Sequence, residues 1–506
     1  MLRGPMVPRP PAHAGPSPAR AAGAVACLAL ALSITQTALA QQPVEPVGED
    51  LLASPGQQNL TLGSGARAFG MGGAFLARAD DATAASWNPA GLSYLRAPEL
   101  SLVGVYNSFT TVENLDNDSL KGSSVDFAAF TWPVGAGEVR GAVQLSYQRA
   151  ISFDGTRHVD QYGAVRDNEG NEVGTQLVRV DDGVSDGGFD VVALGTGLRL
   201  SRHVRAGFTV NRWLTGYGQR LERNLYNLST NRPRRDFDLD FRPSGWSFNF
   251  GLIVSPIDTL NVAAVYKTPF TANVSLDRSR RDYFGPAGAP VEITTNDWSS
   301  HSVRLDFPSS FGFGLSWRLR DTLTLSADYT RSEWSSARIR DYFAVVATPP
   351  SDDDGNPAQP PPPIFFPERQ YPTLEAVPDP DDPNDPARLV AQQDAEQIRA
   401  GVEWVLIKGR LKIPLRVGYF NDRQITPAPG GEAVRFNGIT AGTGLILGAL
   451  QLDLAWVYEF GEYFVAAEAS AEALQQQAAT PPIRYALTTN RVYASIIYRF
   501  SGRWLP

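Results

Sequence analysis

The spacing of amphipathic segments constrains the fold of this chain more than any other feature. From Glu99 onward, fourteen segments alternate apolar and polar residues with period two, and long gaps alternate with tight turns between them. Long gaps such as 152–186 and 338–393 alternate with turns such as 201–202 and 408–410. An even strand number with short turns at one end and long loops at the other is typical of bacterial transmembrane β-barrels. The predicted strands are 99–109, 124–134, 138–151, 187–200, 203–213, 237–254, 259–276, 300–318, 322–337, 394–407, 411–420, 433–447, 450–464 and 482–500.

Side-chain alternation within these segments supports a barrel. Leu323, Leu325 and Tyr329 lie on one face of their strand, whereas Thr324 and Asp328 lie on the other. One face would contact lipid and the other a lumen, and the sheet must close because an open edge cannot satisfy its backbone in hydrocarbon. We therefore predict an all-β protein, a transmembrane antiparallel β-barrel of about fourteen strands spanning 99–506. Aromatic girdles are expected from residues near strand ends, namely Trp132, Trp213, Tyr266, Trp317, Trp334, Trp404, Tyr419 and Tyr498.

The N-terminus predicts export. Residues 1–20 carry three arginines and no acid, and an apolar stretch from Ala21 to Ala40 ends in a small-x-small cleavage site. Residues 1–40 are thus a predicted signal peptide, and the single cysteine, Cys27, lies inside it. Without the three arginines, 42 basic residues stand against 53 acids, which gives a net charge near −11. That charge argues against nucleic acid as a partner.

A glycine-rich apolar run, 63–92, lies between the signal and the first strand. It is too poor in polar residues for a solvated linker and too rich in glycine for a long helix. We expect residues 41–98 to form a hatch that closes the lumen. Gly70, Gly72 and Gly73 would allow close approach of the backbone to the barrel wall. Pro89 holds Asn88 extended, so that the Asn88 side chain can bond exposed backbone.

The same run resembles the hatch of the outer-membrane long-chain fatty acid and hydrocarbon transporters, the FadL-like family. The resemblance rests on Gly70-Met-Gly-Gly-Ala-Phe75, on the pair Asp80 and Asp81, and on Asn88-Pro89-Ala90-Gly91. Segments 308–314, 323–329, 401–404 and 415–419 are similar to later strands of that family. The resemblance covers most of the mature chain.

This resemblance implies uptake of hydrophobic small molecules through a plugged barrel with lateral release, and no catalysis or cofactor. It gives Gly70, Gly72, Gly73, Asp80, Asp81, Asn88, Pro89, Ala90 and Gly91 a hatch or gating role. Arg67, Phe69, Phe75 and Arg78 would contact substrate, with Arg67 the better candidate for a carboxylate. Expected partners are a fatty acid or hydrocarbon, outer-membrane lipid and lipopolysaccharide, and the barrel assembly machinery, which reads a C-terminal strand. A monomer is expected.

Other patterns are weaker. The mature histidines, His158, His203 and His301, have no serine motif beside them, so an embedded hydrolase is not favoured. Two acidic runs in the Pro-rich 338–393 loop could hold calcium, but a solvated loop is favoured. Residues 466–477 are predicted to form a short helix.

One alternative function stays open, an outer-membrane anchor or scaffold that docks secreted proteins, because a related barrel family shares a similar hatch sequence.

Overall fold

The computed structural model describes residues 63–113, 116–136, 139–166, 172–225, 234–284, 291–344, 364–370, 393–425, 427–428, 431–465 and 483–500. Four sequence predictions lie outside these ranges. They are the signal peptide at 1–40, the first part of the hatch at 41–62, both acidic runs of the 338–393 loop and the helix at 466–477.

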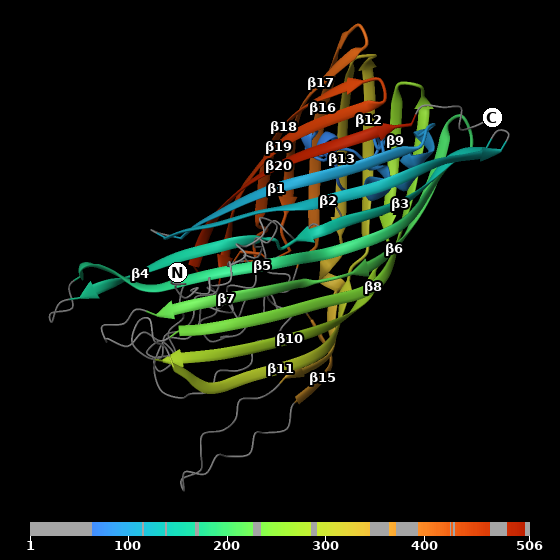
Figure 1. The fold of residues 1–506 in the computed structure, drawn as a ribbon. Helices are drawn as coiled ribbons and strands as arrows, with labels where there is room; N and C mark the ends of the chain where they lie inside the picture. The colour runs from blue at the N-terminus through green and yellow to red at the C-terminus, as the bar shows by residue number, and fades with distance from the viewer. Residues whose placement is uncertain are drawn as a thin grey trace, which may run out of the picture.

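Within the described ranges, fourteen antiparallel strands pair in a closed ring (Figure 1). The last strand pairs with the first, from Glu99 with Arg499 to Val112 with Ala486, so the barrel has no open edge. The ring consists, in order, of β1 (Glu99–Glu113), β2 (Asp116–Ala136), β3 (Val139–Ser152), β5 (Glu172–Arg199), β6 (Val204–Leu214), β8 (Arg234–Ile257), β9 (Leu260–Lys267), β12 (Ser310–Arg320), β13 (Leu323–Ser332), β16 (Ala395–Lys408), β17 (Leu411–Arg423), β18 (Arg435–Leu447), β19 (Leu450–Val465) and β20 (Ile483–Arg499). The predicted all-β barrel and its strand number are confirmed.

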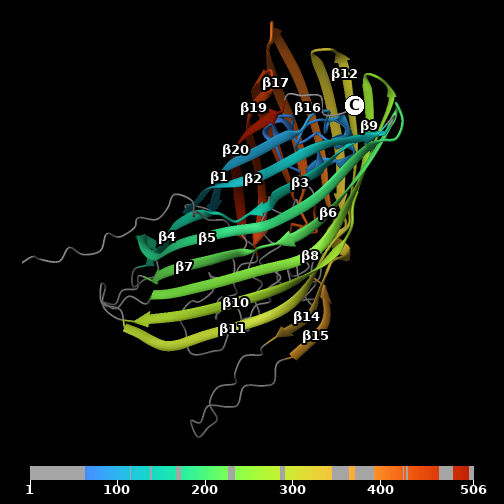
Figure 2. The same ribbon diagram turned by 45° about the vertical axis from the view of Figure 1, so that its right-hand side comes forward.

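Several predicted loops contain further strands, which corrects the sequence-based boundaries. β4 (Gly155–Arg166), β7 (Tyr217–Leu225), β10 (Phe270–Phe284) and β11 (Val291–Phe307) extend the sheet beyond the ring, as Figures 1 and 2 show. β14 (Arg338–Ala344) and β15 (Ile364–Gln370) pair within the segment predicted as a Pro-rich outer loop. In these long hairpins the strands remain hydrogen-bonded to each other beyond the part of the barrel that has an apolar outer face. Side-chain alternation alone therefore did not distinguish the ends of these strands from loops.

Two predicted strands are interrupted by proline. The predicted strand 259–276 is divided between β9 and β10 at Thr268-Pro269, and 300–318 is divided between β11 and β12 at Pro308-Ser309. Proline has no N–H to donate to a ladder, so it ends regular pairing. On one side of the breaks Lys267 pairs with Ser310, and on the other side Phe270 pairs with Phe307.

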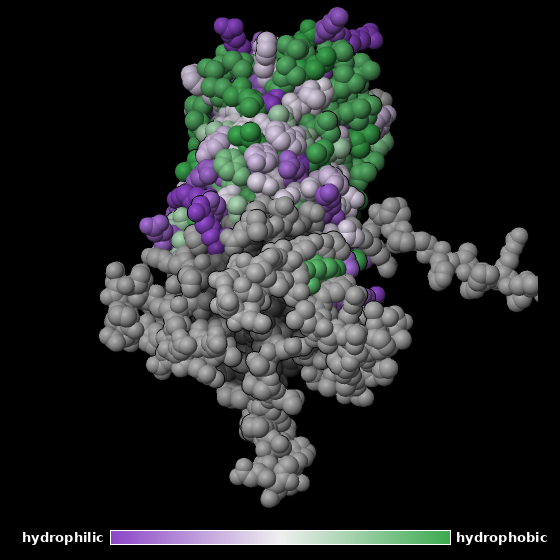
Figure 3. All heavy atoms as spheres, turned by 90° about the vertical axis from the view of Figure 1, so that its left-hand side faces the viewer, coloured by the Kyte–Doolittle hydropathy of each residue, from purple (hydrophilic) through white to green (hydrophobic). Residues whose placement is uncertain are grey.

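The wall has an apolar outer face and a polar inner face. Leu145, Leu194, Phe313 and Leu454 are about half exposed on the outside, while Gln144, Ser326, Asp328 and Asp453 are buried on the inside. Figure 3 shows hydrophobic residues over much of the described wall and hydrophilic residues at its upper, short-turn edge. This is the pattern expected of a barrel whose outer surface contacts lipid.

Six of the eight predicted girdle aromatics are exposed on the outer face: Trp132, Tyr266, Trp317, Trp404, Tyr419 and Tyr498. The prediction is wrong for two. Trp213 is 8% exposed and Trp334 is 2% exposed, because both lie in an apolar cluster inside the barrel. Trp334 belongs to η2 (Trp334–Ser336), a helical turn that follows β13.

Residues 63–95 lie inside the barrel and are called the luminal segment (Figure 1). It contains three short helical pieces, α2 (Ala66–Gly70), α3 (Ala84–Trp87) and η1 (Pro89–Tyr94). Most of its side chains are buried, including Met71, Phe75 and Leu92. No helix in the described part of the chain is long and apolar enough to cross a membrane.

Candidate functional site

The luminal segment is hydrogen-bonded to wall strands all around the barrel. Because its short helical pieces leave many backbone groups without a partner in the segment, inward-facing polar side chains of the wall supply partners. Phe75 and Leu76 donate their backbone N–H groups to Asp328 on β13 at 2.6 and 2.7 Å. The other contacts are Ser64 with Asp126, Gln144 with the Ala82 carbonyl at 2.8 Å, Asn261 with the Ala77 carbonyl at 3.2 Å, Arg399 with the Gly72 carbonyl at 2.9 Å and Thr440 with the Gly70 carbonyl at 3.1 Å.

A cluster of buried charges joins the segment to the short-turn end of the barrel. Glu403 of β16 lies at its centre, with Arg67 Nε at 3.0 Å from Oε2 and Arg78 Nη2 at 3.2 Å from Oε1. On the wall side, Arg416 Nε is 2.8 Å from Glu403 Oε2, and Arg416 Nη1 is 2.7 Å from Asp453. Glu403 and Arg416 are almost completely buried. We call Arg67, Arg78, Asp80, Asp81, Glu403, Arg416 and Asp453 the ion cluster.

The predicted acidic pair belongs to this cluster. Asp80 binds both Arg67, at 2.6 Å, and Arg78. Asp81 binds Arg67 at 3.2 Å and accepts hydrogen bonds from the backbone and hydroxyl of Thr83. Burial opposes the charge of Arg67, but the carboxylates of Asp80, Glu403 and Asp81 outweigh that effect and raise its pKa above the ordinary value. Arg67 therefore stays protonated at every physiological pH.

Glycines on both sides permit the close fit between segment and wall. Gly72 has a φ of +70°, and a Cβ there would lie 2.8 Å from the Ala400 carbonyl oxygen. On the wall, a side chain at Gly401 or Gly418 would collide with the Met71–Gly72 backbone. A side chain at Gly207 would collide with Pro89 in the same way. The wall glycines are thus as necessary to this contact as those of the segment.

Asn88 is extended, as the following proline predicts, and it caps the helical turn η1 that begins at Pro89. Asn88 is fully buried, and its Oδ1 accepts a hydrogen bond from the Ala90 N–H at 3.1 Å. Its Nδ2 donates to the Leu76 carbonyl at 2.9 Å and to the Leu252 carbonyl of β8 at 3.3 Å. Beyond Leu252, the register between β8 and β9 shifts between Val254 and Ile257. Asn88 thus bonds a wall strand beside an irregularity in its pairing.

The two phenylalanines named from the sequence pack inside the segment and against the wall. Phe69 stacks on Tyr493 of β20 at 4.2 Å between ring centroids, and both Phe69 and Phe75 contact the edge of Trp87. Phe75 has no exposed surface, and Phe69 is 8% exposed. In this conformation they stabilise the segment, and a substrate would reach Phe75 only if the segment moved.

An aromatic cavity lies on the long-loop side of the segment. Three rings stack in series, with Trp213 to Phe270 at 4.9 Å and Phe270 to Phe307 at 4.7 Å. Trp334 contacts the edge of Phe307. Ser86 of the luminal segment contributes to the cavity, next to the proline-interrupted strand ends. Its lining residues are Ser86, Gln148, Ala150, Val191, Asn211, Trp213, Ser247, Asn249, Lys267, Thr268, Phe270, Phe307, Pro308, Ser310, Ser332 and Trp334.

Sequence reasoning named the segment's residues but not their wall partners. Asp80, Asp81, Arg67 and Arg78 converge on one cluster, whereas Asn88 to Gly91 lie apart from it against β5, β6 and β8. Glu403, Arg416 and Arg399 were missed. A signal existed, because charged residues at lumen-facing positions of a period-two strand are costly unless paired.

No protein-family model matches this chain, and no curated protein matches it. Solved structures do resemble it. A Pseudomonas aeruginosa FadL homologue superposes with a TM-score of 0.52 at 11% identity, covering 87% of this chain and 99% of its own. The CymD monoaromatic hydrocarbon channel gives 0.50 at 13% identity, with coverages of 88% and 99%. A deltaS2 mutant of the TodX monoaromatic hydrocarbon channel gives 0.51 at 13% identity, with coverages of 87% and 99%. The chain therefore has the fold of the FadL-like barrels.

Proposed function

We propose that this protein is a bacterial outer-membrane channel for the uptake of hydrophobic small molecules. The observation that carries the proposal is the aromatic cavity inside the barrel, directly beside the luminal segment. A water-filled pore has no need of a stacked series of Trp213, Phe270 and Phe307, whereas an apolar molecule gains free energy by leaving water for such a surface.

The luminal segment is the proposed plug, within a hatch that we place at residues 41–98. It is held by hydrogen bonds and ion pairs to strands on several sides of the barrel, so polar solutes would be excluded while it stays in place. Asn88 to Gly91 and the glycines at 70, 72 and 73 would govern its fit. Lateral release is proposed near β8, where Asn88 bonds the wall beside the register shift.

The cavity also suggests the class of substrate. Its rings suit an aromatic hydrocarbon or an acyl chain, and the solved barrels of similar fold include proteins described as monoaromatic hydrocarbon channels and a FadL homologue. Lys267 offers a cation to a substrate carboxylate within the cavity. A carboxylate passing the segment would next meet Arg67 and Arg78. We propose no catalytic role or cofactor, and we propose a monomer inserted by the barrel assembly machinery.

Uptake by cells tests this function. Ala150→Trp places an indole in the cavity, and we expect it to slow uptake of labelled toluene and of a labelled long-chain fatty acid several-fold. Ala441→Trp is the matched control, because Ala441 is exposed on the outer face of β18. Both variants are compared with wild type at equal surface level. Wild-type uptake by Ala150→Trp cells, or no uptake by the wild type itself, would contradict the proposal and favour the scaffold alternative.

A further inference from the structure

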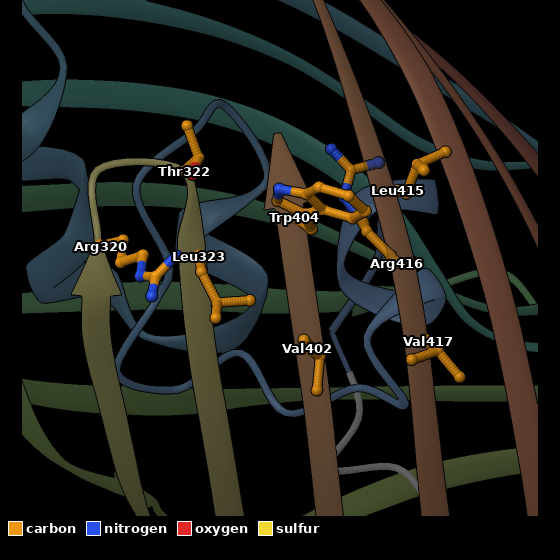
Figure 4. Close-up of a pocket in the computed structure, with 8 residues that line it drawn as sticks. All are labelled: Arg320, Thr322, Leu323, Val402, Trp404, Leu415, Arg416 and Val417. Atoms are coloured by element: carbon orange, nitrogen blue, oxygen red, sulfur yellow. The ribbon is translucent and has the colours of Figure 1, made fainter. Parts of the chain in front are cut away.

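A second groove lies on the outside of the barrel, near its short-turn end, and shares no lining residue with the aromatic cavity. It crosses β12, β13, β16 and β17, and Figure 4 shows its lining from the lipid-facing side. Most of the lining is apolar. The lining residues are Arg320, Thr322, Leu323, Val402, Trp404, Leu415, Arg416 and Val417.

The strand register places Arg320 in the same row as apolar residues that line the groove. Arg320 pairs with Leu323, Leu323 pairs with Trp404, and Trp404 pairs with Leu415. These four residues therefore form one row across the outer face. The adjoining row toward the barrel centre contains Val402 paired with Val417. Trp404 is 51% exposed and Val417 is 57% exposed, so the groove is open to the membrane. In Figure 4 the Arg320 guanidinium extends toward Leu323.

The position of Trp404 indicates the depth of the groove in the bilayer. Tryptophan prefers the boundary between headgroups and hydrocarbon. If Trp404 marks that boundary, Arg320 lies at headgroup level and the Val402–Val417 row lies in hydrocarbon. A lipid has its phosphate at headgroup level and its acyl chains toward the middle of the bilayer. The groove has the matching arrangement, with a cation at headgroup level and apolar residues in the hydrocarbon.

The surrounding charge also favours an anion. Lys408 and Arg410 extend the basic surface at the β16–β17 turn, and Asp321 is the acidic residue of the β12–β13 turn. In the described ranges, none of Arg320, Lys408 and Arg410 forms an ion pair with a carboxylate. Inside the wall, by contrast, Arg416 is committed to Glu403 and Asp453 and cannot bind a lipid outside. Of the two arginines that line the groove, Arg320 is therefore the one available to an anion outside the barrel.

We propose that this groove binds one anionic phospholipid of the periplasmic leaflet. The phosphate contacts Arg320, and an acyl chain lies along Leu323, Val402 and Val417. The short turns of such barrels face the periplasm, which places the site in that leaflet. The inference rests on the membrane-barrel part of the proposed function but not on transport.

Native mass spectrometry of the purified mature barrel, titrated with phosphatidylglycerol in detergent, tests the site. We expect one tightly retained phosphatidylglycerol on the wild type. Arg320→Glu should lower its retention about tenfold, since it replaces an attractive charge by a repulsive one. Val402→Trp should also lower retention, because it fills the groove. Arg202→Glu is the matched control, since Arg202 is an exposed arginine in the 201–202 turn, away from the groove.

The folded state of each variant is checked by heat-modifiable migration. Equal retention by wild type and Arg320→Glu, or equal retention of phosphatidylcholine and phosphatidylglycerol by the wild type, would overturn the proposal. Uptake in Arg320→Glu cells should equal that of wild type. Normal lipid retention combined with lost uptake in this variant would instead identify the groove as a substrate exit. Failure of wild-type uptake alone contradicts the transport function and leaves the lipid site standing.

Discussion

At the residue scale, Glu403 holds the luminal segment to the wall. Three arginines, Arg67, Arg78 and Arg416, share its carboxylate, so removing that charge leaves cations buried without full compensation. Breaking a buried ion pair by removing one partner is strongly destabilising, whereas an exposed pair contributes little. A single substitution in the ion cluster should therefore loosen the luminal segment without disrupting the strand pairing of the barrel.

We predict that Glu403→Gln loosens the segment at a cost of about 3 kcal/mol, because three guanidinium groups lose a shared buried anion. Planar-bilayer recordings should show a higher conductance to small ions than wild type. Glu462→Gln is the control, since Glu462 pairs with Arg484 at an exposed site and should cost below about 1 kcal/mol. Equal conductance in wild type and Glu403→Gln would mean that the cluster does not secure the segment.

Asn88 carries a separate prediction. Asn88→Ala removes the donor to the Leu252 and Leu76 carbonyls and the acceptor for the Ala90 N–H, which should cost about 1–3 kcal/mol locally. The closed ladder should still fold and reach the membrane. Uptake of labelled fatty acid and toluene should slow, measured in cells matched for surface protein. Asn437→Ala on β18 is the control, and wild-type rates in the Asn88→Ala cells would refute a gating role.

At the element scale, the strands were predictable because each alternates apolar and polar residues with period two. The places where strands are interrupted, and the distant residues that their side chains contact, were not predictable from that pattern. Alternation identified all fourteen ring strands, but Pro269 and Pro308 break two of them next to the cavity. Trp213 and Trp334 were assigned to the outer girdle, because position near a strand end does not reveal which face a residue occupies. Glu403 meets Arg67 across 336 positions of sequence, a contact that no local pattern indicates.

The luminal segment as an element yields its own prediction. Deleting residues 42–92 removes the buried core formed by Met71, Phe75 and Trp87 but none of the ring's strand pairing. We expect the shortened protein to remain a heat-modifiable barrel, because strand pairing supplies its closure. It should leak small polar solutes in liposome-swelling assays, to a greater extent than Glu403→Gln. A folded barrel with unchanged permeability would show that the segment is not a plug.

At the scale of the whole molecule, the two ends of the barrel differ in construction. One end has turns of a few residues, such as Lys408 to Arg410, while the other continues into long hairpins. The cavity lies toward the hairpins, and the ion cluster and the outer groove lie toward the turns. The proposed uptake from outside therefore requires the hairpins to face the medium and the turns to face the periplasm.

Cysteine labelling tests that orientation, since the mature chain is predicted to contain no cysteine of its own. Asn356→Cys, in the long segment between β14 and β15, should react with a membrane-impermeant maleimide on intact cells. Arg410→Cys, in the β16–β17 turn, should react only after the outer membrane is permeabilised. The cysteine-free parent controls for background labelling, and permeabilised cells show that each site is reactive. Labelling of Arg410→Cys on sealed cells would invert the barrel and place the aromatic cavity toward the periplasm, where it could not receive molecules from outside.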